Sequence, residues 1–290
     1  MGLCDDVRRS CEAMAASARH VTIDLSRSTA VEPGPDPQLD PERHYLDGNA
    51  EHVAMYVLTL DAINFGSGWF PTLRKRPGCS GYYTVAWALA DRFRAEGPWT
   101  CDELRSLGAA EIAGVLGQDT DHDLMPLYAR ALNDLGGFLD GRAALDLVGA
   151  AGGSAERLAE QLARGMAFFD DRGFYKRAQI VPSDLALAGV AEFEDLDRLT
   201  IFADNLVPHV LRVDGVLVYH EALAARIDTS ELIEPGAEEQ EIRACAVHAC
   251  EAIAAEMGVP PRVLDTWLWN RGQQARYKAV PRHRTRTVFY

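Results

Sequence analysis

An aspartate at a break between two apolar segments is the residue of this sequence best placed to do chemistry. Asp204 follows the apolar residues Leu199, Ile201 and Phe202 and precedes Pro208, after which apolar residues resume. Proline lacks an N–H and disfavours helical geometry in the residue before it, so we expect a chain break near Asp204. A carboxylate at such a break is either a helix N-cap or a functional acid, and local sequence alone favours the cap.

Three further groups of residues suit ligand binding, each with a plain structural alternative. Phe65 and Trp69, in the glycine-rich stretch NFGSGWFPTL, could stack on a planar base or fill the core. Lys176 and Arg177 begin an otherwise apolar segment and could hold one anion, or form a solvated helix end. The C-terminal tail could clamp a phosphate or be a charged tail. Its basic residues are Arg282, His283, Arg284 and Arg286.

The charge balance limits the size of the ligand. The chain has 290 residues and a net charge of −14, from 29 basic and 43 acidic residues. Proteins that bind nucleic-acid polymers usually present a broad basic face, because phosphate neutralisation drives their affinity. An acidic chain with a local basic pocket is better suited to a mononucleotide, so we expect no stable binding of a nucleic-acid polymer.

Cysteine usage and hydropathy predict a cytoplasmic protein. Six cysteines are scattered without a C-x-x-C pair, which indicates reduced thiols rather than a disulfide framework or a zinc site. No apolar run has the length of a membrane span, and the N-terminal stretch has no apolar signal region. We therefore expect neither membrane insertion nor secretion.

Common cofactor and metal motifs are missing from the sequence. It contains no G-x-G-x-x-G, G-x-x-x-x-G-K-[ST], G-x-S-x-G or H-E-x-x-H. The acidic stretch DTDHD at 119–123 lacks the glycine and the closing glutamate of a calcium loop, which favours a solvated turn. We expect no metal and no cofactor.

Apolar periodicity predicts a mainly α-helical chain. The expected helices cover residues 5–20, 50–63, 82–93, 154–169 and 238–257, with another beginning at Pro260-Pro261. Thr100 and Glu103 match a capping box before two short helices hinged at Gly108. We expect Gly136-Gly137 to interrupt the helical region 121–148.

Three other segments carry specific expectations. Pro182 predicts a kink or a boundary in the helix of residues 174–193. The stretch VDGVLVY predicts a strand or a hairpin that turns at Asp-Gly. Residues 32–42 hold four prolines and form a loop, which is either a lid or disordered. We expect one compact domain over residues 1–290, with residues 1–45 as an N-terminal extension or lid.

Five segments, taken in order, resemble the queuosine salvage protein family. They are NFGSGWFPTL, FYKRAQ, LTIFADNLVP, EIRACAVHACE and HRTRTVFY, and the similarity runs from about residue 50 to residue 290. The resemblance implies a helical fold related to helix-hairpin-helix DNA glycosylases. It also implies metal-free cleavage of queuosine 5′-monophosphate to queuine and ribose 5-phosphate. The family's catalytic aspartate falls on Asp204 and its lysine on Lys176, which we assign to the 5′-phosphate.

The chemistry of this reaction indicates what else the site needs. Positive charge develops on the sugar, and Asp204 could stabilise it, attack it or activate water. Asn205 and His209 are the closest donors to keep that carboxylate ionised, although eukaryotic relatives are expected to carry an aromatic residue in place of Asn205. Queuine is a 7-deazapurine with a cationic side-chain amine, so a second carboxylate is expected. Asp184 is the first choice, although it could simply cap a helix, and Glu241 is the second, although it could pair with Arg243.

The leading hypothesis is therefore a queuosine 5′-monophosphate N-glycosidase that salvages queuine for transfer-RNA modification. Its expected substrate contacts are Asn64, Phe65, Trp69, Lys176, Asp184, Asn205, His209, His283 and Arg284. Two alternatives remain: a DNA or RNA base-excision glycosylase, and a non-catalytic binder of a modified nucleotide.

Overall fold

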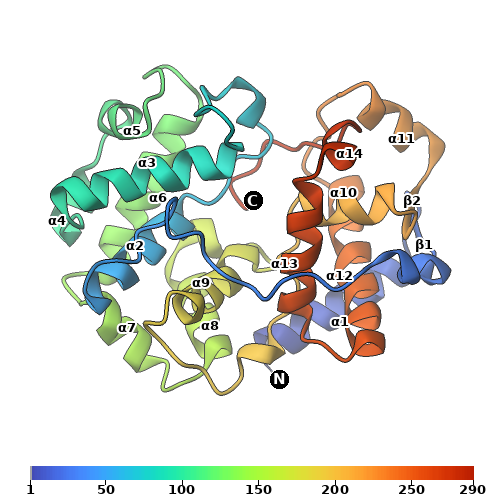
Figure 1. Ribbon diagram of the computed structural model, residues 1–290, viewed down its shortest axis with the longest axis horizontal. Helices are drawn as coiled ribbons and strands as arrows, with labels where there is room; N and C mark the ends of the chain where they lie inside the picture. The colour runs from blue at the N-terminus through green and yellow to red at the C-terminus, as the bar shows by residue number, and fades with distance from the viewer. Residues whose placement is uncertain (1) are drawn as a thin grey trace.

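Helices form almost all of the regular structure in the computed structural model, which describes residues 2–290 (Figure 1). The longer α-helices are α1 (Leu3–Ala16), α2 (Ala50–Ala62), α3 (Gly81–Glu96), α6 (Leu124–Leu139), α8 (Ala155–Gly165), α9 (Lys176–Leu187), α12 (Ala237–Met257) and α13 (Pro261–Gly272). The shorter ones are α4 (Cys101–Ser106), α5 (Ala109–Leu116), α7 (Ala144–Ala150), α10 (Leu206–Val213), α11 (Glu221–Asp228) and α14 (Ala275–Lys278). The predicted mainly helical class is confirmed.

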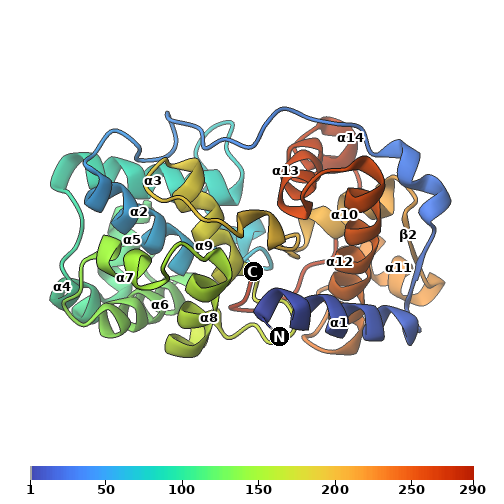
Figure 2. The same ribbon diagram turned by 90° about the horizontal axis from the view of Figure 1, so that it is seen from below.

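The helices lie in two groups, side by side in both ribbon views (Figures 1 and 2). One group holds α2 to α9, where α4 packs on α6 and α2 packs on α9. The other holds α1 and α10 to α14, where α1 packs along α12 and α10 packs on α13. The sequence order explains the division, except that α1 joins helices from the opposite end of the chain.

A two-stranded antiparallel sheet joins distant parts of the sequence. Strand β1 (Val21–Ile23) pairs with β2 (Leu217–Tyr219), with Val21 opposite Tyr219. The predicted strand is confirmed, but the predicted hairpin is wrong. Its Asp214-Gly215 turn connects α10 to β2, and the partner strand comes from the N-terminal region.

Helix α6 runs through Gly136-Gly137, so the predicted interruption there is wrong. A Cβ atom on Gly136 would lie 2.7 Å from the Cys101 carbonyl oxygen and 2.8 Å from the Arg105 nitrogen. This glycine therefore lets the backbones of α4 and α6 approach closely. The helix ends instead at Asp140, which adopts a left-handed conformation with φ 47°.

The two prolines near the expected site behave differently. Helix α9 continues through Pro182, where we expected a kink or a boundary. Pro208 lies in the first turn of α10, where its missing N–H costs no intrahelical hydrogen bond. The chain before α10 is irregular, so the predicted break near Asp204 is confirmed.

Residues 32–42 form an irregular strap that crosses between the two helical groups (Figure 2). The Trp267 indole Nε1–H donates a 2.9 Å hydrogen bond to the carbonyl of Pro35. Gly34 packs so closely on the same ring that an added Cβ would lie 2.7 Å from Trp267 Cδ1. The strap is thereby attached to α13.

Across residues 2–290, every helix is too short or too polar to span a lipid bilayer.

The two adjacent glycines of α6 offer a matched test of the helix contact. We expect Gly136→Ala to lower the free energy of unfolding by about 1–3 kcal/mol, because the added methyl overpacks the α4–α6 contact. Gly137→Ala adds a Cβ with no atom within 4 Å and should stabilise the helix by about 0.5–1 kcal/mol. Urea denaturation measures both, and equal effects would contradict the packing role of Gly136.

Candidate active site

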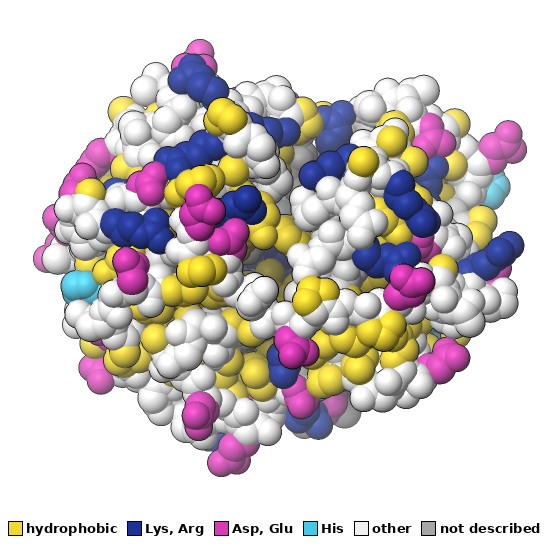
Figure 3. Space-filling model, viewed as in Figure 1, with side chains coloured by type: hydrophobic (Ala, Val, Ile, Leu, Met, Phe, Trp, Pro, Cys, Tyr) yellow, Lys and Arg dark blue, Asp and Glu magenta, His cyan; other side chains and the backbone are white. Residues whose placement is uncertain are grey.

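A cavity of about 870 Å³ lies between the two helical groups. Its volume is within the range of about 300–1,000 Å³ that small-molecule sites occupy. Its walls come from the loop after α2, the start of α3, α9, the segment before α10, α13 and the C-terminal tail. Gln38 and Leu39 of the strap also line it. In the space-filling view, Lys and Arg side chains gather around the upper part of this hollow (Figure 3).

Asp204 lines this cavity and also caps a helix. Its Oδ1 accepts hydrogen bonds from the backbone N–H groups of Leu206 at 2.7 Å and Val207 at 3.1 Å. The side chain is half-buried, and Oδ2 accepts no hydrogen bond from residues 2–290. The two readings of Asp204 are therefore compatible, because one oxygen caps α10 while the other remains available to a ligand.

The segment that carries Asp204 is fixed by two buried side chains. The Arg243 Nε–H donates to the carbonyl of Ala203 at 2.9 Å, and its guanidinium binds both oxygens of Asp171 at 3.0 and 2.6 Å. On the other side, the Phe202 N–H donates to Asp265 Oδ1 at 2.8 Å. These contacts hold the carboxylate in place before any ligand arrives.

Lys176 lies among carboxylates. Its side chain is buried, lines the cavity and donates from Nζ to the Asn64 carbonyl at 3.2 Å. Burial lowers the pKa of Lys176, while the charges of Asp204, Asp61 and Asp265 oppose that shift. These surroundings favour a counter-ion for the acids over the predicted phosphate ligand, because a phosphate there would meet several negative charges.

Two further acids line the cavity near this lysine. Burial raises the pKa of Asp184 well above its usual range, and the charge of Asp61 adds to the shift. Burial likewise raises the pKa of Asp265, with the charge of Asp204 as the next cause. Asp265 was not among the predicted site residues. Its only sequence signal is a carboxylate inside the helical stretch VLDTWLW.

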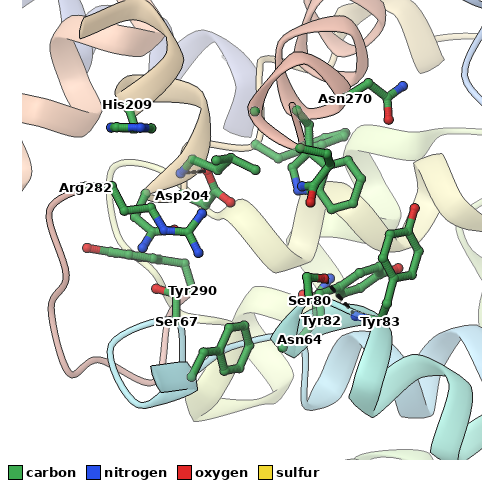
Figure 4. Close-up of a pocket in the computed structure, with 18 of the residues that line it drawn as sticks. Asn64, Ser67, Ser80, Tyr82, Tyr83, Asp204, His209, Asn270, Arg282 and Tyr290 are labelled. Atoms are coloured by element: carbon green, nitrogen blue, oxygen red, sulfur yellow. Dashed lines mark hydrogen bonds between the residues drawn. The ribbon is translucent and has the colours of Figure 1, made fainter. Parts of the chain in front are cut away.

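A separate group of cations lies beside Asp204. Burial lowers the pKa of Arg282, and the charges of Asp204 and Arg284 act on it in opposite directions. Burial also lowers the pKa of Lys75, and the charge of Arg282 lowers it further, so these cations share one region. Figure 4 shows Arg282 next to Asp204, with Ser67 nearby. The Ser67 hydroxyl is buried and has no hydrogen-bond partner within residues 2–290.

Aromatic rings form the other end of the cavity. Tyr82, Tyr83 and Trp269 contact one another, with ring centroids 5.3 to 5.9 Å apart. In Figure 4, both tyrosines lie across the cavity from Arg282. We did not predict these rings as ligand contacts, because a Tyr-Tyr pair at a helix start looks like ordinary core packing.

The structure brings together most of the predicted site residues. Those that line the cavity are Asn64, Phe65, Lys176, Asp184, Asp204, Asn205, His209, Arg282 and Arg284. Those that do not are Trp69, Arg177, Glu241, His283 and Arg286.

The contacts of the lining residues limit their roles. Phe65 is only 1% exposed and packs edge-on against Tyr128, with ring centroids 5.0 Å apart. Asn205 donates from Nδ2 to the His283 carbonyl at 3.2 Å. His209 Nε2 lies 2.9 Å from the Tyr277 carbonyl, and burial lowers the pKa of His209, so this imidazole is neutral. A neutral His209 can orient a ligand but carries no charge toward it.

Three residues outside the cavity have structural roles instead of the predicted ones. Trp69 is buried and packs against the Arg286 guanidinium, which lies 5.7 Å from the ring centroid, and neither residue lines the cavity. His283 is 1% exposed, and burial lowers its pKa to about 3, so it cannot clamp a phosphate as a cation.

Two charged residues outside the cavity hold the backbone. Arg177 donates to the carbonyls of Ala62 and Val288, both at 2.6 Å, which makes it a core brace rather than an anion ligand. Glu241 Oε2 accepts from the N–H groups of Arg19 and His20 at 2.9 and 2.7 Å. Glu241 and Arg243 could have paired with each other or with neighbours. Within residues 2–290 Arg243 pairs with Asp171 and with its neighbour Glu239, and not with Glu241.

Within residues 2–290, no three His, Cys, Asp or Glu side chains converge as metal ligands. The acidic stretch 119–123 forms ion pairs, with Asp119 2.6 Å from Arg74 and Asp123 3.3 Å from Arg286.

A fixed carboxylate facing a cavity of small-molecule size is typical of an enzyme with a small substrate. A family model described as "Queuosine salvage protein" matches residues 43–290. The chain belongs to the queuosine salvage protein family, as the five sequence segments indicated.

Relatives match along nearly the full chain. A protein from Sphaerobacter thermophilus is 33% identical over 100% of this chain and 98% of its own length. A Bos taurus protein is 28% identical over 98% of this chain and 92% of its own, and a Mus musculus protein is 28% identical over 84% and 83%. All three are named queuosine 5′-phosphate N-glycosylase/hydrolase.

The buried Arg243–Asp171 pair supplies a stability prediction. Arg243→Gln should lower the free energy of unfolding by about 3–5 kcal/mol, because it leaves Asp171 buried without its cation. Arg226→Gln is the control, since Arg226 forms ion pairs with Glu231 and Glu238 at the surface and should change stability little. Denaturant titration compares them, and a small effect of Arg243→Gln would contradict the bracing role.

Proposed function

We propose that this protein hydrolyses the N-glycosidic bond of queuosine 5′-monophosphate, releasing queuine and ribose 5-phosphate for queuine salvage. The observation that carries the proposal is the position of Asp204. One oxygen of its carboxylate is fixed by the N-terminus of α10, and the side chain lines the cavity between a cationic and an aromatic end. The names of the full-length relatives support the same reaction.

The fixed carboxylate suits the charge that develops in this reaction. As the glycosidic bond breaks, positive charge builds on the anomeric carbon and is stabilised by a carboxylate held beside it. The backbone N–H groups of Leu206 and Val207 fix one oxygen of Asp204 in position. Because these groups are already in place, little reorganisation is needed when the charge appears.

The 5′-phosphate is best accommodated by the cations beside Asp204. Arg282 and Lys75 face the same region, and the unpartnered Ser67 hydroxyl adds a donor. Arg284 also lines the cavity, although its Nη2 already donates to the Ser230 carbonyl at 2.7 Å. Arginine forks match phosphate oxygens well, which makes Arg282 the principal anchor in this proposal.

The base then extends to the aromatic end. Tyr82 and Trp269 offer ring faces and edges for a flat 7-deazapurine. Asp184, from the neighbouring α9, is the carboxylate assigned to the side-chain amine of the base. Since a 7-deazapurine has no N7 to protonate, help for the leaving group comes from hydrogen bonds and stacking.

Replacing the catalytic acid tests the proposal directly. Asp204→Asn keeps a side-chain oxygen for the cap but removes the charge, so kcat should fall by about 10²–10⁴-fold with KM little changed. The control is Asp195→Asn, because Asp195 accepts from the Ala155 N–H at 2.6 Å and caps α8 away from the cavity. Release of queuine, followed by chromatography, measures both variants, and near-normal turnover in Asp204→Asn would refute the assignment.

The phosphate assignment has its own test. Arg282→Gln should raise KM for the monophosphate by about 10–100-fold while changing turnover of the unphosphorylated nucleoside little. Lys176→Met should instead impair both substrates to a similar degree, because this lysine balances the charge of the acids around it. If Lys176→Met impaired turnover of the monophosphate but not of the nucleoside, the phosphate contact would be assigned to Lys176 instead.

The two alternatives predict different behaviour. A base-excision glycosylase should be retained on heparin or duplex DNA at moderate salt. A non-catalytic binder should bind the nucleotide tightly and form no sugar product overnight. We expect neither outcome, because the net charge of −14 disfavours binding of a polymer and the Asp204 side chain lines the cavity as a reactive group.

A further inference from the structure

Asp184 lines the cavity, and a second carboxyl group, Asp61 on the neighbouring helix α2, lies behind the cavity wall and acts on it. Asp61, in the last turn of α2, is fully buried, and its Oδ1 accepts a 3.3 Å hydrogen bond from Asn64 Nδ2. Its Oδ2 is buried without a partner within residues 2–290. Asp184 lies on α9, which packs against α2, and its carboxyl accepts no hydrogen bond from residues 2–290. The cavity therefore contains an acid with unused acceptor sites, backed by a second acid that is sealed from solvent.

The groups that face Asp184 leave this pair short of positive charge. They are Tyr56 and Asp61 on α2, Tyr82 on α3, Lys176 on α9 and Asp265 on α13. Lys176 is the cation among them. His44, two residues after the strap, acts indirectly, with its Nε2 3.0 Å from the Tyr82 hydroxyl, and burial lowers its pKa, which keeps it neutral.

Two cations, Lys176 and Arg177, face three buried carboxylates here, because Asp265 also acts on Asp184, so the acids retain a proton when the cavity holds no further cation. Burial raises the pKa of Asp61 and Asp184, and the charge of Asp61 raises that of Asp184 further. Lys176 opposes both shifts, and Arg177 opposes that of Asp61. A ligand that brings a second ammonium would restore the balance and make the proton unnecessary.

We propose that Asp184, backed by Asp61, is a proton-exchanging receptor for the ammonium group on the side chain of the base. On binding, the cation takes an acceptor site on Asp184, and the proton held by the pair passes to solvent. No other bond forms or breaks. Asp184 is the contacting residue, and Asp61 is a positioning residue that sets how strongly Asp184 holds its proton. This inference rests on the proposed function only for the identity of the ligand.

The aromatic neighbours support the same ligand chemistry. Trp269 and Tyr82 lie at the same end of the cavity, with ring centroids 5.9 Å apart. A ligand cation near such rings is attracted to their faces, and the attraction is greatest where water is excluded. A neutral base substituent would gain neither this attraction nor the ion pair, so the site selects bases with a cationic side chain.

The sign of the pH dependence follows from the exchange. Asp184 has a raised pKa in the free protein, so it is neutral below that pKa and cannot pair with an ammonium. Affinity for queuine should therefore rise as pH increases through the pKa of Asp184, until the amine itself loses its proton. Affinity for 7-deazaguanine, which has the same ring system without the amine, should show no such rise.

Isothermal titration calorimetry of the whole protein measures the exchange. Queuine and 7-deazaguanine are each titrated at several pH values in two buffers of different ionisation enthalpy. The slope of apparent enthalpy against buffer enthalpy gives the protons released. We expect close to one proton released with queuine at low and neutral pH and none with 7-deazaguanine. No release with queuine, or equal release with both bases, would overturn the proposal.

Three variants test whether Asp61 and Asp184 cause the proton release and the pH dependence of queuine binding. Asp61→Asn removes a negative neighbour, so the rise in queuine affinity should shift to lower pH while 7-deazaguanine binding is unchanged. Asp184→Asn should abolish proton release and weaken queuine binding by about 10–100-fold. Asp134→Asn is the control, because Asp134 also has a buried unpartnered oxygen and a pKa raised by burial but lies outside the cavity lining.

The variants also separate this inference from the proposed function. If the pH dependence of queuine affinity is unchanged in Asp61→Asn, or if proton release persists in Asp184→Asn, the proposed receptor role of Asp184 is refuted. If Asp61→Asn does not fold, the Asp184→Asn measurement decides alone. Failure of the wild-type protein to release queuine from the nucleotide would refute the glycosidase instead, whatever the calorimetry shows.

Discussion

A carboxylate stays ionised in a mostly buried cavity only if fixed donors and cations replace the water it loses. Two backbone N–H groups at the start of α10 bind one oxygen of Asp204, and Arg282 lies beside it. The acids farther along the cavity have fewer partners: Asp265 accepts one backbone N–H, from Phe202, and Asp184 accepts no hydrogen bond within residues 2–290. Burial raises the pKa of both. One cavity thus holds an acid with several fixed partners and two acids of raised pKa.

The fold supplies this arrangement by closing two helical groups on one cavity. The Asp204 segment comes from one group and Lys176 from the other, so neither group alone forms the site. Arg243 donates a hydrogen bond to the backbone carbonyl of Ala203, just before Asp204. Arg243 is itself held by an ion pair with Asp171, in the loop before α9. The strap adds Gln38 and Leu39 to the lining while its Pro35 carbonyl is hydrogen-bonded to α13. The Asp204 carboxylate is therefore already in position before a substrate binds, so binding does not have to organise it.

Helix positions could be predicted from the sequence more reliably than side-chain partners. Apolar periodicity located α2 and α12 to within a residue or two, since these helices are set by local pattern. It could not show that Gly136 serves a contact with α4, or that β2 pairs with a strand almost 200 residues earlier, because both depend on tertiary packing. Asp204 was chosen as a site residue from its flanking residues and the family resemblance, and it lines the cavity. Tyr82 and Asp265 were missed, since nothing local separates a cavity-lining aromatic or acid from a core one.

The most direct test of the central claim is a crystal structure of the Asp204→Asn variant with queuosine 5′-monophosphate bound. The account predicts the anomeric carbon within about 3.5 Å of the residue 204 side-chain atom that does not cap α10. It also predicts the phosphate beside Arg282 and the base against the rings of Tyr82 and Trp269. A nucleotide bound with its sugar carbon remote from residue 204, or turned so that the phosphate meets Lys176, would contradict it.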